Sequence, residues 1–186
     1  MKKIILFLFY SITLFSYSSA MANEESKYNI VESNDIYEIR KYSDRLAVQV
    51  VKTNQNNSFR MLFDYISGNN KTNEEIKMTT PVTQMQKDGN MTMQFYLPLK
   101  FNKDNVPNPL RNDLEIVIIK GGYYAVIRYS GRASDKNFIK HKEYLERELK
   151  KDNILIVSPP IRATYNSPFT LPMLRRNEAM FRVNWN

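Results

Sequence analysis

The stretch FRMLFDYISGNN at residues 59–70 has the apolar spacing of an amphipathic helix. Its large apolar residues recur at intervals of three and four, which predicts one apolar stripe along a helix: Phe59, Leu62, Phe63 and Ile66. Ser58, or an asparagine before it, is placed to cap the start of this helix, and Gly68 is placed to end it. We expect the stripe to pack against a neighbouring layer.

Strands are expected on both sides of this helix. β-Branched or alternating runs predict four of them: Ile36–Tyr42, Leu46–Val51, Ile76–Met85 and Met91–Leu97. The Asp88-Gly89 pair between the last two is typical of a tight hairpin. Pro81 has no backbone N–H to give to a neighbouring strand, so we expect it at a sheet edge or a bulge.

After a proline-punctuated loop at residues 98–109, the order of elements starts again. The second half is predicted to contain strands at Leu114–Ile119 and Tyr123–Tyr129, a helix at Asp135–Lys151, and strands at Ile161–Tyr165 and Ala179–Val183. Each half then has the order β-β-α-β-β, although no residue-level repeat accompanies it. We predict a duplicated unit and an α+β fold: a distorted antiparallel β-barrel flanked by two helices.

Composition narrows the chemistry that this chain can carry out. Its 186 residues, 42% hydrophobic and 25% charged, correspond to one globular domain. The absence of cysteine excludes disulfides, thiolate metal sites and a cysteine nucleophile. The chain has one histidine, His141, which excludes any site built on two.

Residues 1–22 are typical of a bacterial secretory signal peptide. Lys2 and Lys3 precede a short apolar run, and the small residues at 20–22 (AMA) fit a signal-peptidase site. The run is short for a membrane core of about 30 Å, which disfavours the alternative of a transmembrane anchor. We therefore expect a single mature domain at 23–186, periplasmic or secreted, with no integral membrane segment.

The net charge is +8, from 27 Lys and Arg against 19 Asp and Glu. The densest basic cluster, at residues 136–151, is interleaved with glutamates at helical spacing, which is typical of a solvated helix face. Export and this mixed pattern both argue against nucleic acid as a partner. A basic surface outside the cytoplasm suits anionic lipid headgroups or acidic small molecules.

Six segments, taken in order, resemble the SOUL haem-binding protein family. They are YEIRKY (37–42), FRMLFDYISGNN (59–70), IKMTTPV (76–82), YSG (129–131), ATYNSP (163–168) and RRNE (175–178). The likeness extends over residues 28–184. It implies the same duplicated barrel with two helices and a non-covalent complex with haem or a related tetrapyrrole. The family has no well-established catalytic centre, so we expect no enzyme.

The resemblance implies that the tetrapyrrole lies in a shallow apolar cleft at the first helix. Its apolar contacts fall on Phe59, Leu62 and Phe63, with Arg60 as the nearest basic residue. Asp64 stands where the family often has a lysine, and its charge has the wrong sign for a propionate.

Arg175 and Arg176 are further candidates for pairing with propionates, because a guanidinium binds a carboxylate through two hydrogen bonds. The plainer interpretation is that these arginines belong to a polar network that holds the last strand. The apolar stripe on the first helix also has a plainer interpretation, in which its residues only pack in the core and bind no ligand.

No iron ligand is assigned. His141 lies on the flank of a stripe formed by Phe138, Leu145 and Leu149, where a lone histidine is usually packed or solvated. Met78 is more typical of a core gap-filler than of a ligand. We therefore expect no metal site in the protein, and a tetrapyrrole held by burial and charge pairing.

Two other classes of function stay open. The duplicated architecture is similar to that of bacterial effector-binding domains, so the chain could be a small-molecule-binding or hydrolytic module; the candidate acid or base residues are Glu38, Asp64 and Glu178. A ligand-free interaction protein would use Met61, Tyr65 and the basic second helix as a contact face; Met61 and Tyr65 lie one turn apart on the opposite face of the first helix and, exposed together, would form a small apolar patch. We expect a monomer.

Overall fold

The computed structural model describes residues 23–52 and 57–185. The first half contains β1 (Glu24–Glu25), β2 (Tyr28–Ser33), β3 (Glu38–Tyr42), β4 (Arg45–Lys52), α1 (Ser58–Ile66), β5 (Thr79–Thr80), β6 (Val82–Lys87) and β7 (Asn90–Tyr96). The second half contains β8 (Glu115–Ile119), β9 (Gly122–Tyr129), α2 (Asp135–Lys151), β10 (Leu155–Ile156), β11 (Ile161–Thr164), the short 3-10 helix η1 (Pro172–Leu174) and β12 (Asn177–Asn184). The predicted signal peptide at 1–22 lies outside the described residues.

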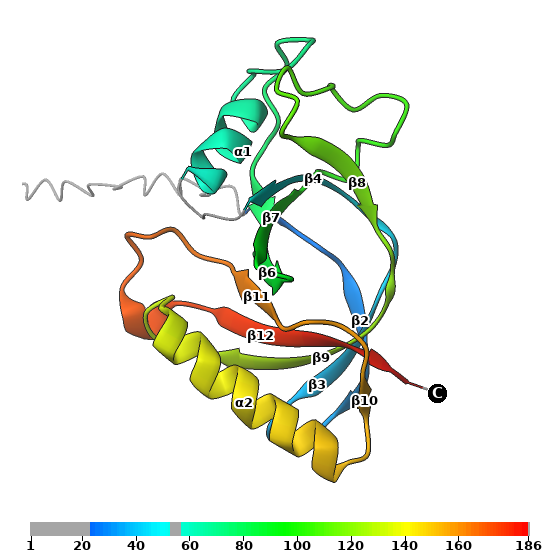
Figure 1. Cartoon of the computed structure of the whole chain (residues 1–186), viewed down its shortest axis with the longest axis vertical. Coiled ribbons are helices and arrows are strands. Elements are labelled where there is room, and N and C mark those ends of the chain that lie inside the picture. Colours follow the sequence, from blue (N-terminus) through cyan, green and yellow to red (C-terminus); the bar gives the residue numbers. More distant parts are fainter. Residues whose placement is uncertain (1–22, 53–56, 186) are drawn as a thin grey trace, which may run out of the picture.

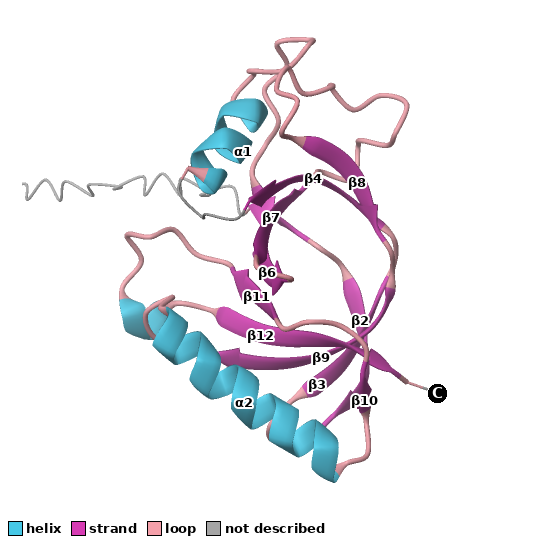
Figure 2. Ribbon diagram, viewed as in Figure 1, coloured by secondary structure: helices cyan, strands magenta, loops and turns pink. Residues whose placement is uncertain are grey.

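One curled antiparallel sheet dominates the molecule, with the strand order β2-β3-β9-β12-β11-β6-β7-β4-β8. Figures 1 and 2 show it curving like half a barrel, with α1 and α2 on its outer side. The outermost strands β2 and β8 each pair with a single neighbour, so hydrogen bonds do not close the barrel within the described residues. Among those residues, no helix is both long and apolar enough to cross a bilayer.

The strand order confirms the duplication. From β3 to β8 it is symmetric about the β11–β6 pair: exchanging β3 with β8, β9 with β4, β12 with β7, and β11 with β6 gives the same order. The first strand of each β-β-α-β-β unit, β3 or β8, pairs with a strand of the other unit: β3 with β9 and β8 with β4. Because the halves exchange strands, they share one sheet.

Each helix covers its own part of the outer face. The core under α1 is formed by Leu62 and Ile66 with Val48 and Val50 of β4 and Phe95 of β7. The core under α2 is formed by side chains of the helix and of strands β3, β9 and β12: Leu145, Leu149, Ile39, Ala125 and Phe181. Alternate strand residues point to the other face, where Tyr42, Tyr124, Val126 and Met180 form a third cluster.

Several predicted elements are confirmed. The bounds of α2 are the predicted ones, and Ser134 caps its start by accepting a hydrogen bond from the backbone N–H of Asn137. Asp88 and Gly89 have φ of 51° and 78°, the left-handed pair that a tight hairpin turn requires. The predicted strand Ile76–Met85 is wrong at its start, because 76–78 is irregular and the strand is divided at Pro81 into β5 and β6.

The predicted orientation of α1 is partly wrong. Leu62 and Ile66 are buried, whereas Phe59 and Phe63 are 45% and 47% exposed. The loop that follows β7 explains the difference, since its residues Phe101 and Val106 join the core under α1 and cover the opposite flank of the helix.

Met61 and Tyr65 lie on that covered flank and are buried, so they do not form the exposed patch that a ligand-free contact face would need. The Tyr65 hydroxyl donates a hydrogen bond to the carbonyl of Pro107 in the covering loop, at 2.7 Å. The expected side-chain cap at the start of α1 is absent as well. Asn57 occupies that position with a left-handed φ of 73°, and its side chain makes no capping hydrogen bond.

Candidate functional site

A cleft of about 840 Å³ opens beside the C-terminal end of α1. Its apolar lining consists of Phe63, Ile66, Ile76, Met78 and Pro98. Its polar lining consists of Asn23, Glu24, Ser67, Glu75, Lys77 and Lys100. The volume falls within the range of about 300–1,000 Å³ that is usual for small-molecule and cofactor sites.

Hydrogen bonds hold the walls of the cleft together. The amide of Asn70, a buried residue, donates to the carbonyls of Tyr65 and Glu74 at 3.1 and 2.7 Å, which fixes the turn after α1. The Ile76 N–H donates to the Ile66 carbonyl at 2.7 Å. On the far wall, the Glu24 carboxylate accepts from the Leu99 N–H at 2.8 Å. Segments distant in sequence therefore form one pre-arranged site.

An aromatic surface on α1 continues from the cleft. The rings of Phe59 and Phe63 are stacked, with centroids 6.1 Å apart and planes 12° from parallel. Phe59 also packs edge-on against the buried ring of Phe95, at 5.1 Å. Two large aromatic side chains are thus left half-exposed side by side, an arrangement that can receive a flat apolar molecule.

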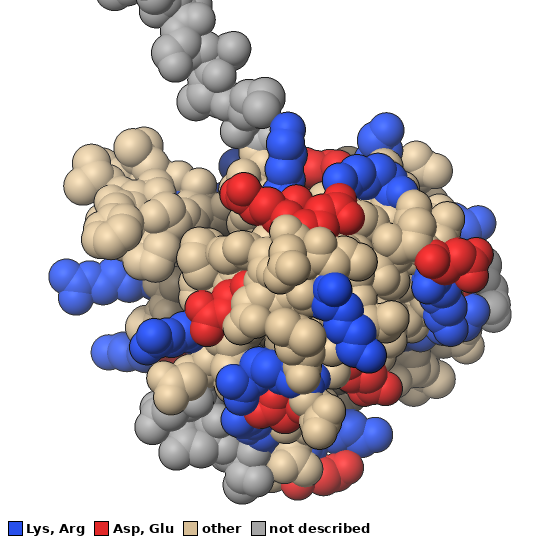
Figure 3. Space-filling view, turned by 90° about the horizontal axis from the view of Figure 1, so that it is seen from above, with Lys and Arg blue, Asp and Glu red and all other residues tan. Residues whose placement is uncertain are grey.

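Charges of both signs surround the cleft. Lys77 is exposed, and the Lys100 ammonium lies 2.9 Å from the Glu74 carboxylate. Seen from above, the molecule shows Lys and Arg interspersed with Asp and Glu over one face (Figure 3). Neither lysine was selected from the sequence. Lys77 could have been found, because it stands within IKMTTPV, whereas the chain fold alone brings Lys100 to the cleft.

The predicted site residues on α1 have different environments. Phe63 lines the cleft, and the ring of Phe59 stacks on the ring of Phe63. Arg60 is exposed on the same helix. Leu62 is fully buried in the core under the helix, so its side chain supports α1 and does not line the cleft.

Arg175 and Arg176 are both engaged within the protein. The Arg175 guanidinium donates to the carbonyl of Thr170 at 2.8 Å and to that of Pro168. The Arg176 guanidinium binds Glu178 and Glu25 and lies 3.7 Å above the centre of the Tyr165 ring. The plainer interpretation from the sequence, a polar network that holds the last strand, describes these contacts.

The network is centred on Glu178, which is fully buried. One carboxylate oxygen accepts from Arg40 at 2.9 Å and from the Tyr165 hydroxyl at 2.7 Å, and the other accepts from Arg176 at 2.9 Å. Burial, followed by the charge of Glu178, raises the pKa of Tyr165 well above its usual value, so its hydroxyl stays a donor.

Two of the three carboxylates considered for an enzymatic role share one arginine. Arg40 binds Glu38 at 2.6 Å as well as Glu178, while Asp64 lies apart on α1. The Glu178 oxygens are occupied by protein donors and have no exposed surface. This arrangement holds strands β3 and β12 together and gives a substrate no access to Glu178.

His141 is a packed side chain on α2. Its Nδ1 lies 2.8 Å from the Asn137 carbonyl, and its ring stacks on Tyr129 with centroids 4.1 Å apart. Met78, by contrast, lines the cleft. Within 23–52 and 57–185, no group of three or more His, Asp or Glu side chains is arranged to hold a metal ion.

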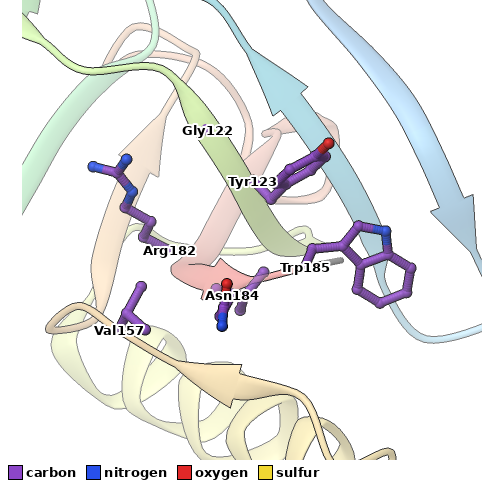
Figure 4. A pocket seen from close by; sticks show the side chains of 7 residues that line it. Gly122, Tyr123, Val157, Arg182, Asn184 and Trp185 are labelled. Carbon is purple, nitrogen blue, oxygen red and sulfur yellow. The ribbon is translucent and has the colours of Figure 1, made fainter.

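A second hollow, of about 450 Å³, lies at the C-terminal end of β12 (Figure 4). Tyr123, Trp185 and Arg182 lie around it without converging on one point. The Arg182 guanidinium donates to the Gly121 carbonyl at 2.8 Å and lies against Gly122, 3.0 Å from the place where a Cβ on that residue would stand. These contacts give the arginine a structural role.

Comparison with known families is decisive here, because the model of the SOUL heme-binding protein family matches residues 23–182. The chain belongs to the SOUL family. A search of curated proteins gives no match.

Solved structures share the fold of this SOUL protein at low identity. The C-terminal domain of EcmrR is 10% identical, with a TM-score of 0.60 over 84% of this chain and 98% of that one. A hydrolase from Listeria innocua is 9% identical, with a TM-score of 0.55 over 83% and 94%. An uncharacterized conserved protein from Listeria innocua is 9% identical, with a TM-score of 0.55 over 88% and 94%. At these identities the likeness concerns the fold alone.

Proposed function

We propose that this protein binds haem or a related tetrapyrrole non-covalently in the cleft beside α1. The observation that carries the proposal is the pair of stacked, half-exposed rings, Phe59 and Phe63, next to a cleft of about 840 Å³ with both apolar and charged lining residues. Exposed aromatic surface of this kind is costly in water unless a ligand or partner covers it. Membership of a haem-binding family supports the same ligand class.

The residues of the cleft fit the two parts of such a ligand. Phe63, Ile66 and Met78 provide contacts for a flat apolar macrocycle, and Lys77 and Lys100 provide cations for its carboxylates. In this proposal the lysines take the role that the sequence assigned to Arg175 and Arg176. Since no histidine lines the cleft, apolar burial carries most of the affinity, with modest strength and fast exchange.

We further propose that the protein acts as an exported, monomeric carrier and not as an enzyme. Export is supported by the signal-peptide pattern at 1–22, and the proposed location is the periplasm or the outside of the cell. A binding role, in place of catalysis, is supported by the environment of Glu178. This candidate acid or base is fully buried, and its carboxylate already accepts hydrogen bonds from protein side chains such as Arg40. A cleft open to solvent suits uptake and release.

The test is a haemin titration followed by the Soret band. Phe63→Glu places a charge in the apolar cleft and is expected to weaken haemin binding at least tenfold. Tyr144→Glu is the matched control, because Tyr144 is a 37% exposed aromatic residue on α2. The haemin affinity of this variant should stay within threefold of the parent. Equal losses in both variants would indicate adsorption without a site, and an unchanged Phe63→Glu would place the site elsewhere.

A second titration isolates the charge contribution. Lys77→Ala should weaken binding of a porphyrin dicarboxylic acid by a few-fold and leave binding of its dimethyl ester unchanged, because the ester has no anionic group. Lys120→Ala, an exposed lysine that pairs with Asp44 away from the cleft, should change neither. A loss that is the same for acid and ester would exclude carboxylate pairing at Lys77.

A further inference from the structure

A loop with an unusually apolar surface joins β11 to β12. Within residues 167–174, here called the apolar loop, four large side chains face solvent: Phe169 (96% exposed), Leu171 (60%), Met173 (75%) and Leu174 (68%). Figure 1 shows this connection projecting from one end of the molecule, beside the start of α2. Single exposed apolar residues are ordinary, but four on one short projecting loop mark an interaction surface.

Hydrogen bonds within the apolar loop fix its shape. The Arg175 guanidinium donates to the carbonyls of Thr170 and Pro168. The N–H of Thr170 donates to the Ser167 carbonyl at 3.0 Å, and that of Leu174 to the Leu171 carbonyl at 2.9 Å. Pro168 and Pro172 add no N–H. Many backbone N–H and C=O groups of the loop therefore have hydrogen-bond partners within the protein and do not need water.

Cations flank the loop. The Gly131 N–H donates to the Pro172 carbonyl at 2.8 Å, which ties the loop to the segment that leads into α2. Arg132 in that segment and Lys136 in the first turn of α2 are both exposed, and neither forms an ion pair with any residue that the structure describes. The neighbouring acid, Asp135, is neutralised by Arg162 at 2.6 Å. The loop is thus bordered by uncompensated positive charge.

We infer that the apolar loop inserts into the surface of an anionic lipid bilayer. Phe169, Leu171 and Met173 would enter the boundary between headgroups and acyl chains, where backbone groups left without hydrogen bonds are costly. Arg132 and Lys136 would lie at the level of anionic headgroups. Apolar insertion and charge together supply the two signals that stable surface attachment requires. The inference does not depend on tetrapyrrole binding.

The decisive experiment reports on the loop itself. With the native tryptophan removed by Trp185→Phe, Phe169→Trp places a fluorophore at the tip of the loop. Vesicles of phosphatidylcholine and phosphatidylglycerol with brominated acyl chains should shift its emission to the blue and quench it. Leu155→Trp in the same background is the control, since Leu155 is 62% exposed on β10, and its tryptophan should stay unquenched. Absence of quenching at 169, or equal quenching at both positions, would overturn the inference.

Binding measurements on the full chain separate the two contributions. Phe169→Ser with Leu171→Ser should reduce insertion of the loop into anionic vesicles at least tenfold, as reported by a tryptophan at Met173, while Leu155→Ser should not. Arg132→Gln with Lys136→Gln should reduce binding to anionic vesicles and not to phosphatidylcholine alone. Sedimentation velocity tests the alternative of self-association. If the parent protein self-associates, the serine variant does not, and the parent shows no binding to vesicles, then the loop binds a second copy of the chain and the lipid inference fails.

Discussion

The guanidinium of Arg40 lies 2.9 Å from the carboxylate of Glu178, and the two side chains are 3% and 0% exposed. The pair connects β3 to β12 across the intervening strand β9. Both residues stand in segments on which the resemblance to the family was based, YEIRKY and RRNE, so in this chain those segments help to hold the sheet together. Burial of two charges is costly in itself, and here each charge is compensated by its partner and by further hydrogen bonds.

Removing one member of this pair should destabilise the fold strongly. Arg40→Leu leaves Glu178 buried with a donor missing, and we expect the free energy of unfolding in urea to fall by about 3–5 kcal/mol. Lys120→Ala is the control, because it removes an exposed ion pair with Asp44 and should leave unfolding almost unchanged. Similar midpoints for both variants would mean that the buried pair contributes no more than a surface pair.

Two neighbours on α1 should respond very differently to truncation. Leu62 is fully buried, so Leu62→Ala should cost about 2–5 kcal/mol of unfolding free energy. Phe63 is 47% exposed, and Phe63→Ala should cost less than about 2 kcal/mol. Chemical denaturation of both variants checks the order, and a larger loss at Phe63 would mean that the whole predicted stripe is buried.

Much of the fold follows from local patterns. The β-β-α-β-β order of each half, the bounds of α2 and the hairpin at Asp88-Gly89 each depend on residues close together in the chain, and the structure contains them as predicted. The edge strand β2 was not predicted. Five of its six residues are exposed, so its sequence lacks the alternation of buried and exposed residues that indicates a strand.

The rest depends on contacts between distant segments. Both flanks of α1 carry apolar residues, and the choice between them is made by the loop at residues 97–114, whose Phe101 and Val106 bury Met61 and Tyr65. The pairing of strands between the two halves likewise cannot be predicted from local periodicity, because it joins residues that are far apart in the sequence. For the site, Phe63 was found from the sequence, whereas Lys100 reaches the cleft through the tertiary fold.

His141 is expected to play no part in tetrapyrrole binding. It lies on α2, where its Nδ1 is within hydrogen-bonding distance of the Asn137 carbonyl and its ring stacks on Tyr129. His141→Ala should therefore keep the haemin affinity within about threefold of the parent, with an unmoved Soret band. A tenfold loss in a folded variant, with a shifted Soret band, would make His141 the iron ligand and place the site on the other helix.

Stability should fall at alkaline pH because of buried tyrosines. Burial raises the pKa of Tyr42 and of Tyr129 to about 12, from the ordinary value of 10. Between pH 10 and 12 these hydroxyls keep their protons in the folded state and lose them in the unfolded state. Unfolding then releases protons, so the free energy of unfolding decreases as the pH rises, by at most about 1.4 kcal/mol per pH unit for each such group.

Tyr129→Phe isolates one of these groups. The variant keeps the aromatic ring that stacks on His141 and removes the hydroxyl proton, so the fall in unfolding free energy from pH 10 to 12 should be shallower than in the parent. Urea unfolding at several pH values measures the two slopes, and absorbance at 295 nm follows tyrosine ionisation in the folded state. Equal slopes, or ionisation of Tyr129 near pH 10 in the folded protein, would show that its hydroxyl is in contact with water.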